Sequence, residues 1–251
     1  MSGSIQVKHQ QEIVSIFLNR PKRRNALSLR LLADLSAALS NEVDEQTNAV
    51  IICGSAGTFS AGADISDLHG TAEDLQMDDA IEEVTGKIRN LPVPVIAAID
   101  GPCMGGAFDL ALSCDYRVAS YSAFFQVPAA RLGLLYNPRS VVRMTKRLGR
   151  DAVFRMLVLG ERISAEDALS AGVVSKLVKD SSHEGAFSIA RATAGNQRAA
   201  ASATKQLLNE ITDDSYDNTY DAGYWEERRV EFLTSEDRHV AITAERKRRG
   251  F

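Results

Sequence analysis

Residues 92–114 decide the fold, and their sequence is PVPVIAAIDGPCMGGAFDLALSC. The two prolines at the start disfavour a helix there, so the apolar run that ends at Ile99 predicts a buried strand. Asp100-Gly-Pro ends that strand, and Gly105-Gly106 leads into a helix rich in alanine and leucine over Ala107–Cys114. The stretch therefore predicts a strand, a small-residue turn and a helix, which is the repeating unit of an α/β fold.

The same order of elements begins earlier in the chain. Asn48–Cys53 is a short apolar strand, and the loop that follows it to Gly62 contains three glycines and two serines. Turns of small residues leave backbone N–H groups unpaired and let a ligand approach them closely. If Ser60–Asp64 and Gly101–Gly106 met at one point, their N–H groups would stabilise negative charge on a carbonyl oxygen. The alternative is that these glycines serve tight packing alone.

Outside these two units the pattern is simpler. Ile5–Val7 and Ile13–Leu18 predict a hairpin, and Ser28 is a helix N-cap before Leu31, Leu32, Leu35 and Leu39 on one face. The polar segment Asp67–Asp79 shows little apolar periodicity, which leaves its order open. From about residue 185 the chain is expected to be helical, so we predict an α/β core over residues 1–190 and a helical region over 191–251.

Composition excludes several classes of protein. The chain has 251 residues, of which 45% are apolar, and 29 basic residues against 33 acidic ones give a net charge of −4. This balance argues against nucleic acid as a partner, and no apolar run is long enough for a membrane span. Three cysteines without a CxxC pair predict a reduced, cytoplasmic protein, and four scattered histidines indicate no metal site. The motifs of nucleophile-elbow hydrolases and of nucleotide-binding loops are absent.

A set of ordered motifs covers nearly the whole chain. They are Asn19-Arg-Pro, Arg24-Asn-Ala-Leu27, Phe59-Ser-Ala-Gly-Ala-Asp-Ile65, Pro94–Gly101, Gly105-Gly106, Leu110–Arg117, Leu132-Gly133, Gly172-Val-Val174 and Glu245-Arg-Lys-Arg. Together they closely resemble the enoyl-CoA hydratase/isomerase (crotonase) family. The resemblance implies a spiral of ββα turns with a C-terminal helical region used for trimerisation, and an acyl-CoA thioester as the partner. It implies no separate cofactor, because coenzyme A is part of the substrate, and a homotrimer or a dimer of trimers.

The resemblance also assigns roles to residues. The two oxyanion-hole donors correspond to the backbone N–H groups of Ala63 and Gly106, and the dipole of the helix that begins near Gly106 would add to their effect. The positions that correspond to substrate contacts are Arg24, Ala26, Ala61, Asp64, Ile65, Met104, Gly105, Ala129, Leu132 and Tyr136. Lys22, Arg23 and Lys247 are candidate partners for the CoA phosphates, although a solvated basic face explains them equally well.

The chain departs from the family at its catalytic acids. Typical hydratases carry two glutamates, one to activate water and one to deliver a proton. Here the first position holds Asp109 and the second holds Ala129, which cannot transfer a proton. Asp109 is expected to act as a base or to orient water, unless it only satisfies backbone donors. Asn137 stands where dienoyl-CoA isomerases of the family carry an aspartate, and Tyr136 and Arg139 either face the acyl chain or form a surface loop.

These observations predict an enzyme that stabilises a thioester enolate, nominally an enoyl-CoA hydratase. Because Ala129 replaces the second acid, isomerisation or decarboxylation is a rival reaction. A non-catalytic acyl-CoA-binding protein is the alternative from another class.

Overall fold

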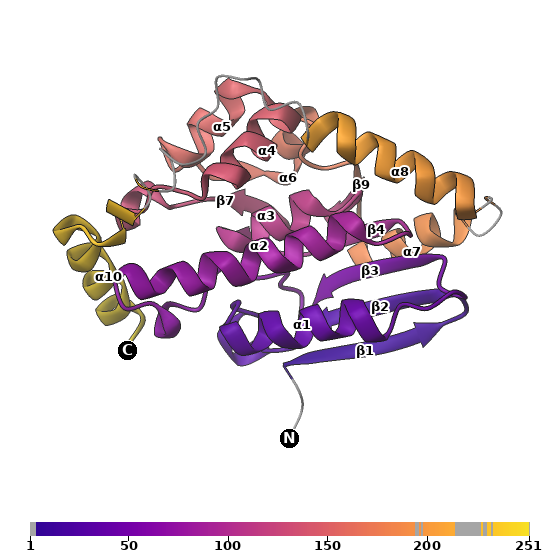
Figure 1. The fold of residues 1–251 in the computed structure, drawn as a ribbon, viewed down its shortest axis with the longest axis horizontal. Coiled ribbons are helices and arrows are strands. Elements are labelled where there is room, and N and C mark those ends of the chain that lie inside the picture. The colour runs from indigo at the N-terminus through magenta and orange to yellow at the C-terminus, as the bar shows by residue number, and fades with distance from the viewer. Residues whose placement is uncertain are drawn as a thin grey trace.

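The predicted apolar strands form one sheet (Figure 1). The structure, a computed structural model, describes residues 4–193, 196, 198–213, 227, 230–231 and 233–250. Within these residues the sheet has six strands in the order β1-β2-β3-β4-β6-β9. They are β1 (Ile5–Gln10), β2 (Ile13–Leu18), β3 (Ala49–Gly54), β4 (Val95–Ile99), β6 (Tyr116–Ser120) and β9 (Lys176–Val178). The predicted hairpin pairs β1 with β2 antiparallel, and every other neighbouring pair is parallel.

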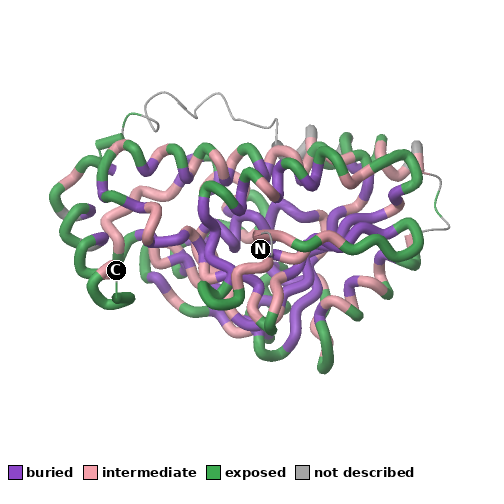
Figure 2. The backbone as a smooth tube through the Cα atoms, turned by 90° about the horizontal axis from the view of Figure 1, so that it is seen from below, coloured by how far each residue is buried: buried purple, intermediate pink, exposed green. Residues whose placement is uncertain are grey.

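Helices cover both faces of this sheet, which explains why its central strands are apolar without alternation. Ile51 and Ile96 face α7 (Ser182–Ala192), whereas the next residues, Ile52 and Ala97, belong to the larger core on the opposite face. That core is completed by α1 (Leu29–Asn41), α2 (Leu75–Asn90) and α3 (Gly106–Ser113). Figure 2 shows the buried residues concentrated in this interior, with exposed residues on the outer turns. Ser28 is the N-cap of α1 as predicted, because its side chain accepts a hydrogen bond from the Leu31 N–H.

A second, smaller sheet lies beside the start of α3. Its order is β5-β7-β8, with β5 (Pro102–Met104), β7 (Phe124–Gln126) and β8 (Ile163–Ser164). The sequence pattern predicted only a turn before Gly105, and it did not predict β7 or β8. Strands of two or three residues are too short to show periodicity, and they exist here because they pair with each other.

The polar segment Asp67–Asp79 is ordered. It forms the 3-10 turns η2 (Ile65–Asp67) and η3 (Ala72–Asp74) and then the first turn of α2. Asp74 and Met77 are buried there. The segment lacks apolar periodicity because hydrogen bonds to a buried carboxylate hold it in place. The Asp74 carboxylate accepts these bonds from the His69 and Gly70 N–H groups.

The second half of the chain is largely helical, as predicted. Its further helices are α4 (Pro138–Leu148), α5 (Arg150–Leu157), α6 (Ala165–Ser170), α8 (Arg198–Asp213) and α10 (Glu236–Arg249). Part of the predicted helical stretch, residues 214–226, lies outside the described residues, and the trimerisation role of 191–251 stays a prediction. Among the helices that the structure describes, none has the length and hydrophobicity of a membrane span.

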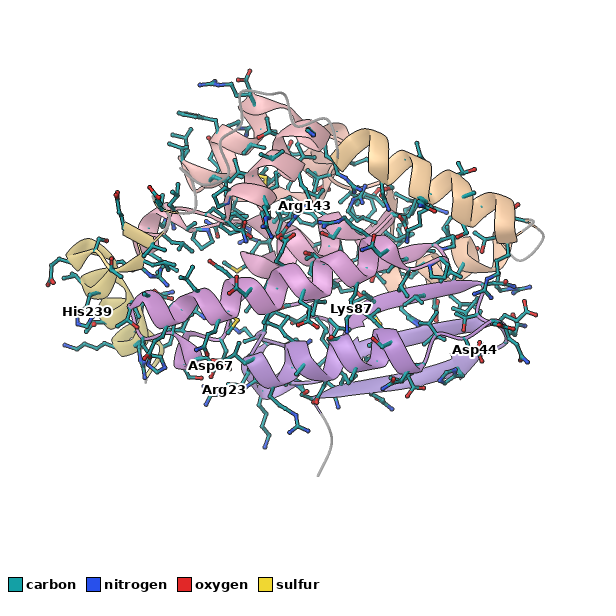
Figure 3. All side chains as sticks on the ribbon, viewed as in Figure 1. Arg23, Asp44, Asp67, Lys87, Arg143 and His239 are labelled. Atoms are coloured by element: carbon teal, nitrogen blue, oxygen red, sulfur yellow. The ribbon has the colours of Figure 1, made fainter. Side chains whose placement is uncertain are left out.

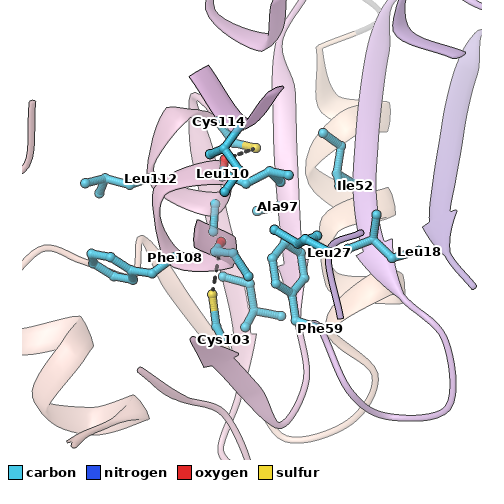
Figure 4. Packing of buried hydrophobic residues seen from close by; sticks show 14 of the residues in the cluster. Leu18, Leu27, Ile52, Phe59, Ala97, Cys103, Phe108, Leu110, Leu112 and Cys114 are labelled. Carbon is cyan, nitrogen blue, oxygen red and sulfur yellow. Dashed lines mark hydrogen bonds between the residues drawn. The ribbon is translucent and has the colours of Figure 1, made fainter. Parts of the chain in front are cut away.

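All three cysteines are buried, free thiols. In the core around α3, the Cys103 and Cys114 thiols donate to the Ala107 and Leu110 carbonyl groups over 3.4 Å each (Figure 4). They lie among Leu27, Phe59 and Phe108, which are almost completely buried. The thiols therefore act as small apolar side chains in the core that supports α3.

Candidate active site

The two small-residue turns meet, as the oxyanion-hole hypothesis requires. Ser60 N–H donates to the Pro102 carbonyl over 3.0 Å, and Met104 N–H donates back to the Ser60 carbonyl over 3.1 Å. Gly62 has φ +86°, and a Cβ atom there would lie 2.6 Å from the Met104 carbonyl oxygen. Only glycine allows this close approach of the two backbones.

This contact brings Ala63 and Gly106 to the wall of one cavity of about 770 Å³, counting space open to solvent. Gly106 is the first residue of α3, so the helix itself supplies no acceptor for its N–H group. Neither the Ala63 nor the Gly106 N–H donates a hydrogen bond to any described residue. Two unused donors at the same cavity suit a carbonyl oxygen that gains negative charge.

The rest of the cavity wall is mostly apolar. Its apolar part comes from α2, η2, η4 (Ala130–Leu132) and the segments around them, namely Ile65, Leu68, Ile81, Met104, Val127, Ala129, Leu132 and Leu134. Its polar part consists of Asp78, Asp109, Tyr136, Asn137, Ser140, Arg238 and Arg249. Such a composition fits an acyl group oriented by a few polar contacts.

Asp109 is one turn inside α3, and its carboxylate already has partners. It is 2% exposed and accepts a hydrogen bond of 2.5 Å from the Ser140 hydroxyl. Arg143 Nη2 lies 3.0 Å from Asp109 Oδ2 and 3.3 Å from Oδ1. The predicted alternative, that this aspartate satisfies only backbone donors, is wrong, because side chains from α4 hold it. These contacts engage mainly Oδ2 of Asp109 and hold the carboxylate against α4.

Arg143 extends the ion pair into a buried network. It reaches from α4 to α2 (Figure 3), where its two terminal nitrogens lie 2.9 and 2.8 Å from the two carboxylate oxygens of Glu82. Burial alone would lower the pKa of Arg143. The charges of Asp109 and Glu82 outweigh burial, so this pKa is raised and the guanidinium stays charged.

Tyr136 is the hydroxyl group that remains available at the cavity. Burial and the nearby charges of Asp109 and Asp78 raise the pKa of Tyr136 well above its usual value. The hydroxyl makes no hydrogen bond to any described residue. It is therefore protonated at neutral pH and free to donate to a bound molecule.

Ala129 and Asn137 do not supply the missing acid. Ala129 is 5% exposed and adds a methyl group to the cavity wall. The Asn137 side chain is the N-cap of α4, where it accepts a hydrogen bond of 3.0 Å from the Arg139 N–H. Arg139 itself is exposed and does not line the cavity. Arg139 therefore does not face the acyl cavity, and it lies on the surface in the first turn of α4 and not in a loop.

Comparison with known proteins identifies the relatives of this site. The family model described as enoyl-CoA hydratase/isomerase matches residues 8–244. The chain belongs to the enoyl-CoA hydratase/isomerase family. The family and the crotonase-type α/β fold that the motifs predicted are confirmed.

The relatives are named for different reactions, namely hydration and decarboxylation. The chain is 32% identical over 242 residues to "2,3-dehydroadipyl-CoA hydratase" of Escherichia coli, covering 95% of this chain and 93% of the relative. It is 34% identical to "Probable enoyl-CoA hydratase echA6" of Mycobacterium bovis, with 69% of this chain and 70% of that protein covered. A solved structure of methylmalonyl-CoA decarboxylase superposes with a TM-score of 0.90 at 25% identity, covering 99% of this chain and 97% of that one.

Most of the residues that the family resemblance assigned lie at the cavity. Those that line it are Ala61, Ala63, Ile65, Met104, Gly105, Gly106, Asp109, Ala129, Leu132 and Tyr136. Arg24, Ala26 and Asp64 do not line it. Arg24 acts instead through its backbone, because its carbonyl accepts from the Ala61 N–H over 3.0 Å.

Ala26 and Asp64 are both tied to Arg20. The Ala26 carbonyl accepts a hydrogen bond from Arg20 Nη1 over 2.6 Å. Arg20 Nη2 lies 2.8 Å from Asp64 Oδ2, an ion-pair distance without hydrogen-bond alignment. Asp64 also accepts from the Ser66 N–H at the start of η2. These buried contacts hold the loop that carries Ala63.

The candidate phosphate partners lie on the surface. Lys22 and Arg23 form the exposed turn η1 (Pro21–Arg23), and Lys247 is exposed on α10. Their role in binding phosphate stays a prediction.

Three charged residues of the cavity were missed by sequence reasoning: Asp78, Arg238 and Arg249. Each sits in a polar helical segment that looks like a solvated surface, and only the packing of α2 and α10 turns it inward. Among the described residues, no group of three or more His, Cys, Asp or Glu side chains is placed to hold a metal ion.

Proposed function

We propose that this chain decarboxylates a 2-carboxyacyl thioester of coenzyme A. The observation that carries the proposal is the state of the acids at the cavity. The first-position carboxylate, Asp109, is bound by Ser140 and Arg143, and the second position is Ala129. Proton abstraction by a carboxylate pair is therefore poorly supported, whereas loss of CO₂ forms the same enolate without a base.

The chain's own groups supply what this reaction needs. As the C2–carboxylate bond breaks, its electron pair enters the C1–C2 bond and negative charge moves to the thioester oxygen. The Ala63 and Gly106 N–H groups would stabilise that oxygen, and each such donor contributes about 3–4 kcal/mol. The protonated hydroxyl of Tyr136 would then deliver a proton to C2, and solvent would reprotonate the tyrosinate.

The apolar wall favours the same step. The leaving carboxylate is charged and CO₂ is neutral, so a surface of Val127, Ala129 and Leu132 stabilises the product more than the reactant. The solved methylmalonyl-CoA decarboxylase, which shares the fold, supports this choice among the reactions of the family.

The coenzyme A part is proposed to extend past Ala61 toward η1. The hydrogen bond between Ala61 N–H and the Arg24 carbonyl joins this edge of the cavity to the loop that carries Lys22 and Arg23. Those cations, with Lys247, would then meet the phosphates. The cytoplasmic location and the assembly as a trimer or a dimer of trimers remain proposals; light scattering of the purified protein measures the latter.

Hydration of an enoyl-CoA is the second candidate. The relatives named as hydratases favour it, and so does Asp78, which lines the same cavity as Asp109 and gives it a second carboxylate. In this reaction one acid would activate water and the other would deliver the proton.

The experiment gives the purified chain malonyl-CoA, methylmalonyl-CoA, crotonyl-CoA and 3-hexenoyl-CoA and follows the products by mass spectrometry. Variants Tyr136→Phe and Asp109→Asn are compared with Tyr121→Phe, a matched control at a tyrosine that is 52% exposed and outside the cavity. For a decarboxylase we expect Tyr136→Phe to slow turnover about a hundredfold, and Asp109→Asn to slow it less than about tenfold.

The other outcomes contradict this proposal and identify the alternatives. Hydration of crotonyl-CoA that Asp109→Asn abolishes, without CO₂ release from either malonyl thioester, establishes the second candidate. A shift of the double bond in 3-hexenoyl-CoA establishes an isomerase. Binding of all four thioesters with no turnover establishes an acyl-CoA-binding protein.

A further inference from the structure

Helix α10 packs against the cavity from a distant part of the sequence. A Cβ atom on Gly133 would lie 2.9 Å from Arg238 Cα, and one on Gly70 would lie 3.2 Å from His239 Cα. Glycines in the loops on both sides therefore let the start of α10 fit between them (His239 is labelled in Figure 3). This packing buries Arg238, which is 1% exposed, in the cavity wall.

The guanidinium of Arg238 is only partly satisfied. Its Nη2 lies 2.7 Å from Asp74 Oδ2. Its Nε and Nη1 are buried and donate to no described residue. A buried donor without an acceptor is costly, so the site lacks an oxygen partner at this point of the wall.

Another arginine of the same protein shows how two carboxylates engage both terminal nitrogens of a guanidinium, although its Nε also has no acceptor. Arg143 bridges two carboxylates, Asp109 and Glu82, through contacts of 2.8–3.3 Å. Arg238 has the first carboxylate, Asp74, and lacks the second. Arg238 lines the cavity and Arg143 does not, so the unpaired nitrogens of Arg238 belong to a side chain of the cavity wall.

We propose that Arg238 binds a carboxylate at the far end of the acyl chain, which the substrate carries in addition to the C2 carboxylate that the proposed decarboxylation removes. This inference rests on the proposed binding of a coenzyme A thioester in the cavity. A charge-assisted contact to a carboxylate is stronger than one to a neutral oxygen. Arg249, which lines the same cavity, adds positive charge, while Asp78 opposes it but already has an interaction of its own.

The experiment measures binding rather than turnover. Isothermal titration calorimetry measures the Kd of butyryl-, hexanoyl- and octanoyl-CoA. Each is compared with the CoA thioester of the same chain length that carries a carboxylate at its ω-carbon. Arg238→Lys keeps a cation for Asp74 but removes the planar fork of donors. Arg155→Lys is the matched control, because Arg155 pairs with Glu161 over 2.6 Å, is exposed and lies outside the cavity.

For at least one of the three chain lengths, we expect the thioester with the ω-carboxylate to bind about tenfold to a hundredfold tighter than the thioester without it. This preference should fall below about threefold in Arg238→Lys and persist in Arg155→Lys. Equal affinity at every length in the wild-type chain overturns the inference and leaves the proposed thioester binding intact. Failure of all the thioesters to bind overturns both. The wild-type comparison decides the matter even if Arg238→Lys does not fold.

Discussion

Replacing Arg143 with methionine removes the cation that lies between two carboxylates in the interior. Asp109 and Glu82 have side chains that are 2% and 17% exposed, and Arg143 contacts both within 3.3 Å. Breaking a buried pair by removing one partner costs about 3–5 kcal/mol, because the remaining charge stays buried. Asp109 and Glu82 both lose this partner, but Glu82 keeps Arg89 Nη2 at 3.6 Å, so we expect a loss within that range.

For a chain of this length, such a loss lowers Tm by about 6–20 °C. The matched control is Arg150→Met, since Arg150 is 78% exposed, lies 3.6 Å from the exposed Asp151 and stacks over the Phe154 ring at 5.6 Å. That pair should contribute less than about 1 kcal/mol. Thermal unfolding of both variants by circular dichroism makes the comparison.

The pH dependence gives an independent check. The pKa of Arg143 is raised in the folded protein, so its stabilising charge is present below its unfolded pKa and is lost only at strongly alkaline pH. Because Arg143 keeps its charge over the whole neutral range, the Tm difference between Arg143→Met and wild type should be the same at pH 7 and at pH ~9. Adding Asp109→Asn should recover part of the loss. A Tm of Arg143→Met within about 2 °C of wild type, or a Tm difference that disappears by pH ~9, would contradict a stabilising role of the Arg143 charge.

Three further changes test other contacts. Gly62→Ala places a Cβ atom 2.6 Å from the Met104 carbonyl oxygen at a residue with φ +86°. We expect the free energy of unfolding, measured in urea, to fall by about 1–3 kcal/mol, and turnover to be lost. Wild-type values of both would contradict a role for the contact between the two loops. Ala129→Glu adds a charge that repels the substrate carboxylate, and kcat/KM for decarboxylation should fall at least about tenfold more than in Ala129→Gln. The hydrogen bond from Arg248 lowers the pKa of Glu245 to about 2, with burial opposing it and Arg249 assisting. Its stabilisation is therefore present above the usual pKa and is lost as pH falls through about 2, so Glu245→Gln should be slightly less stable than wild type at pH 7 and equal to it near pH 2.

The larger elements of the fold were predictable because their signals are local. The apolar runs of β3 and β4 are buried on both faces of the sheet, and Ser28 caps α1 through a residue three positions away. The short strands β5, β7 and β8 were not predicted, because their residues become strands only by pairing across more than twenty positions of sequence.

In the candidate site, too, the features carried by local motifs were predictable and the side-chain contacts were not. The two small-residue turns, the missing acid at Ala129 and the place of Tyr136 could all be read from the motifs, and the structure puts them at one cavity. Arg24 and Asp64 also belong to those motifs, but their contacts are with the protein. A motif fixes the backbone path of a residue better than it fixes the partner of its side chain.

The motifs were sufficient to predict the family and the α/β fold, and they pointed to Ala63 and Gly106 as backbone donors. The partners of the charged groups follow from tertiary packing alone. Asp109 meets partners 31 and 34 residues away, and Asp74 meets Arg238 across 164 residues. Spacing along the chain sets which atoms a helix or turn presents. The charges that those atoms face depend on how distant helices pack, and that packing buries Arg238 in the cavity wall with two nitrogens that donate to no described residue.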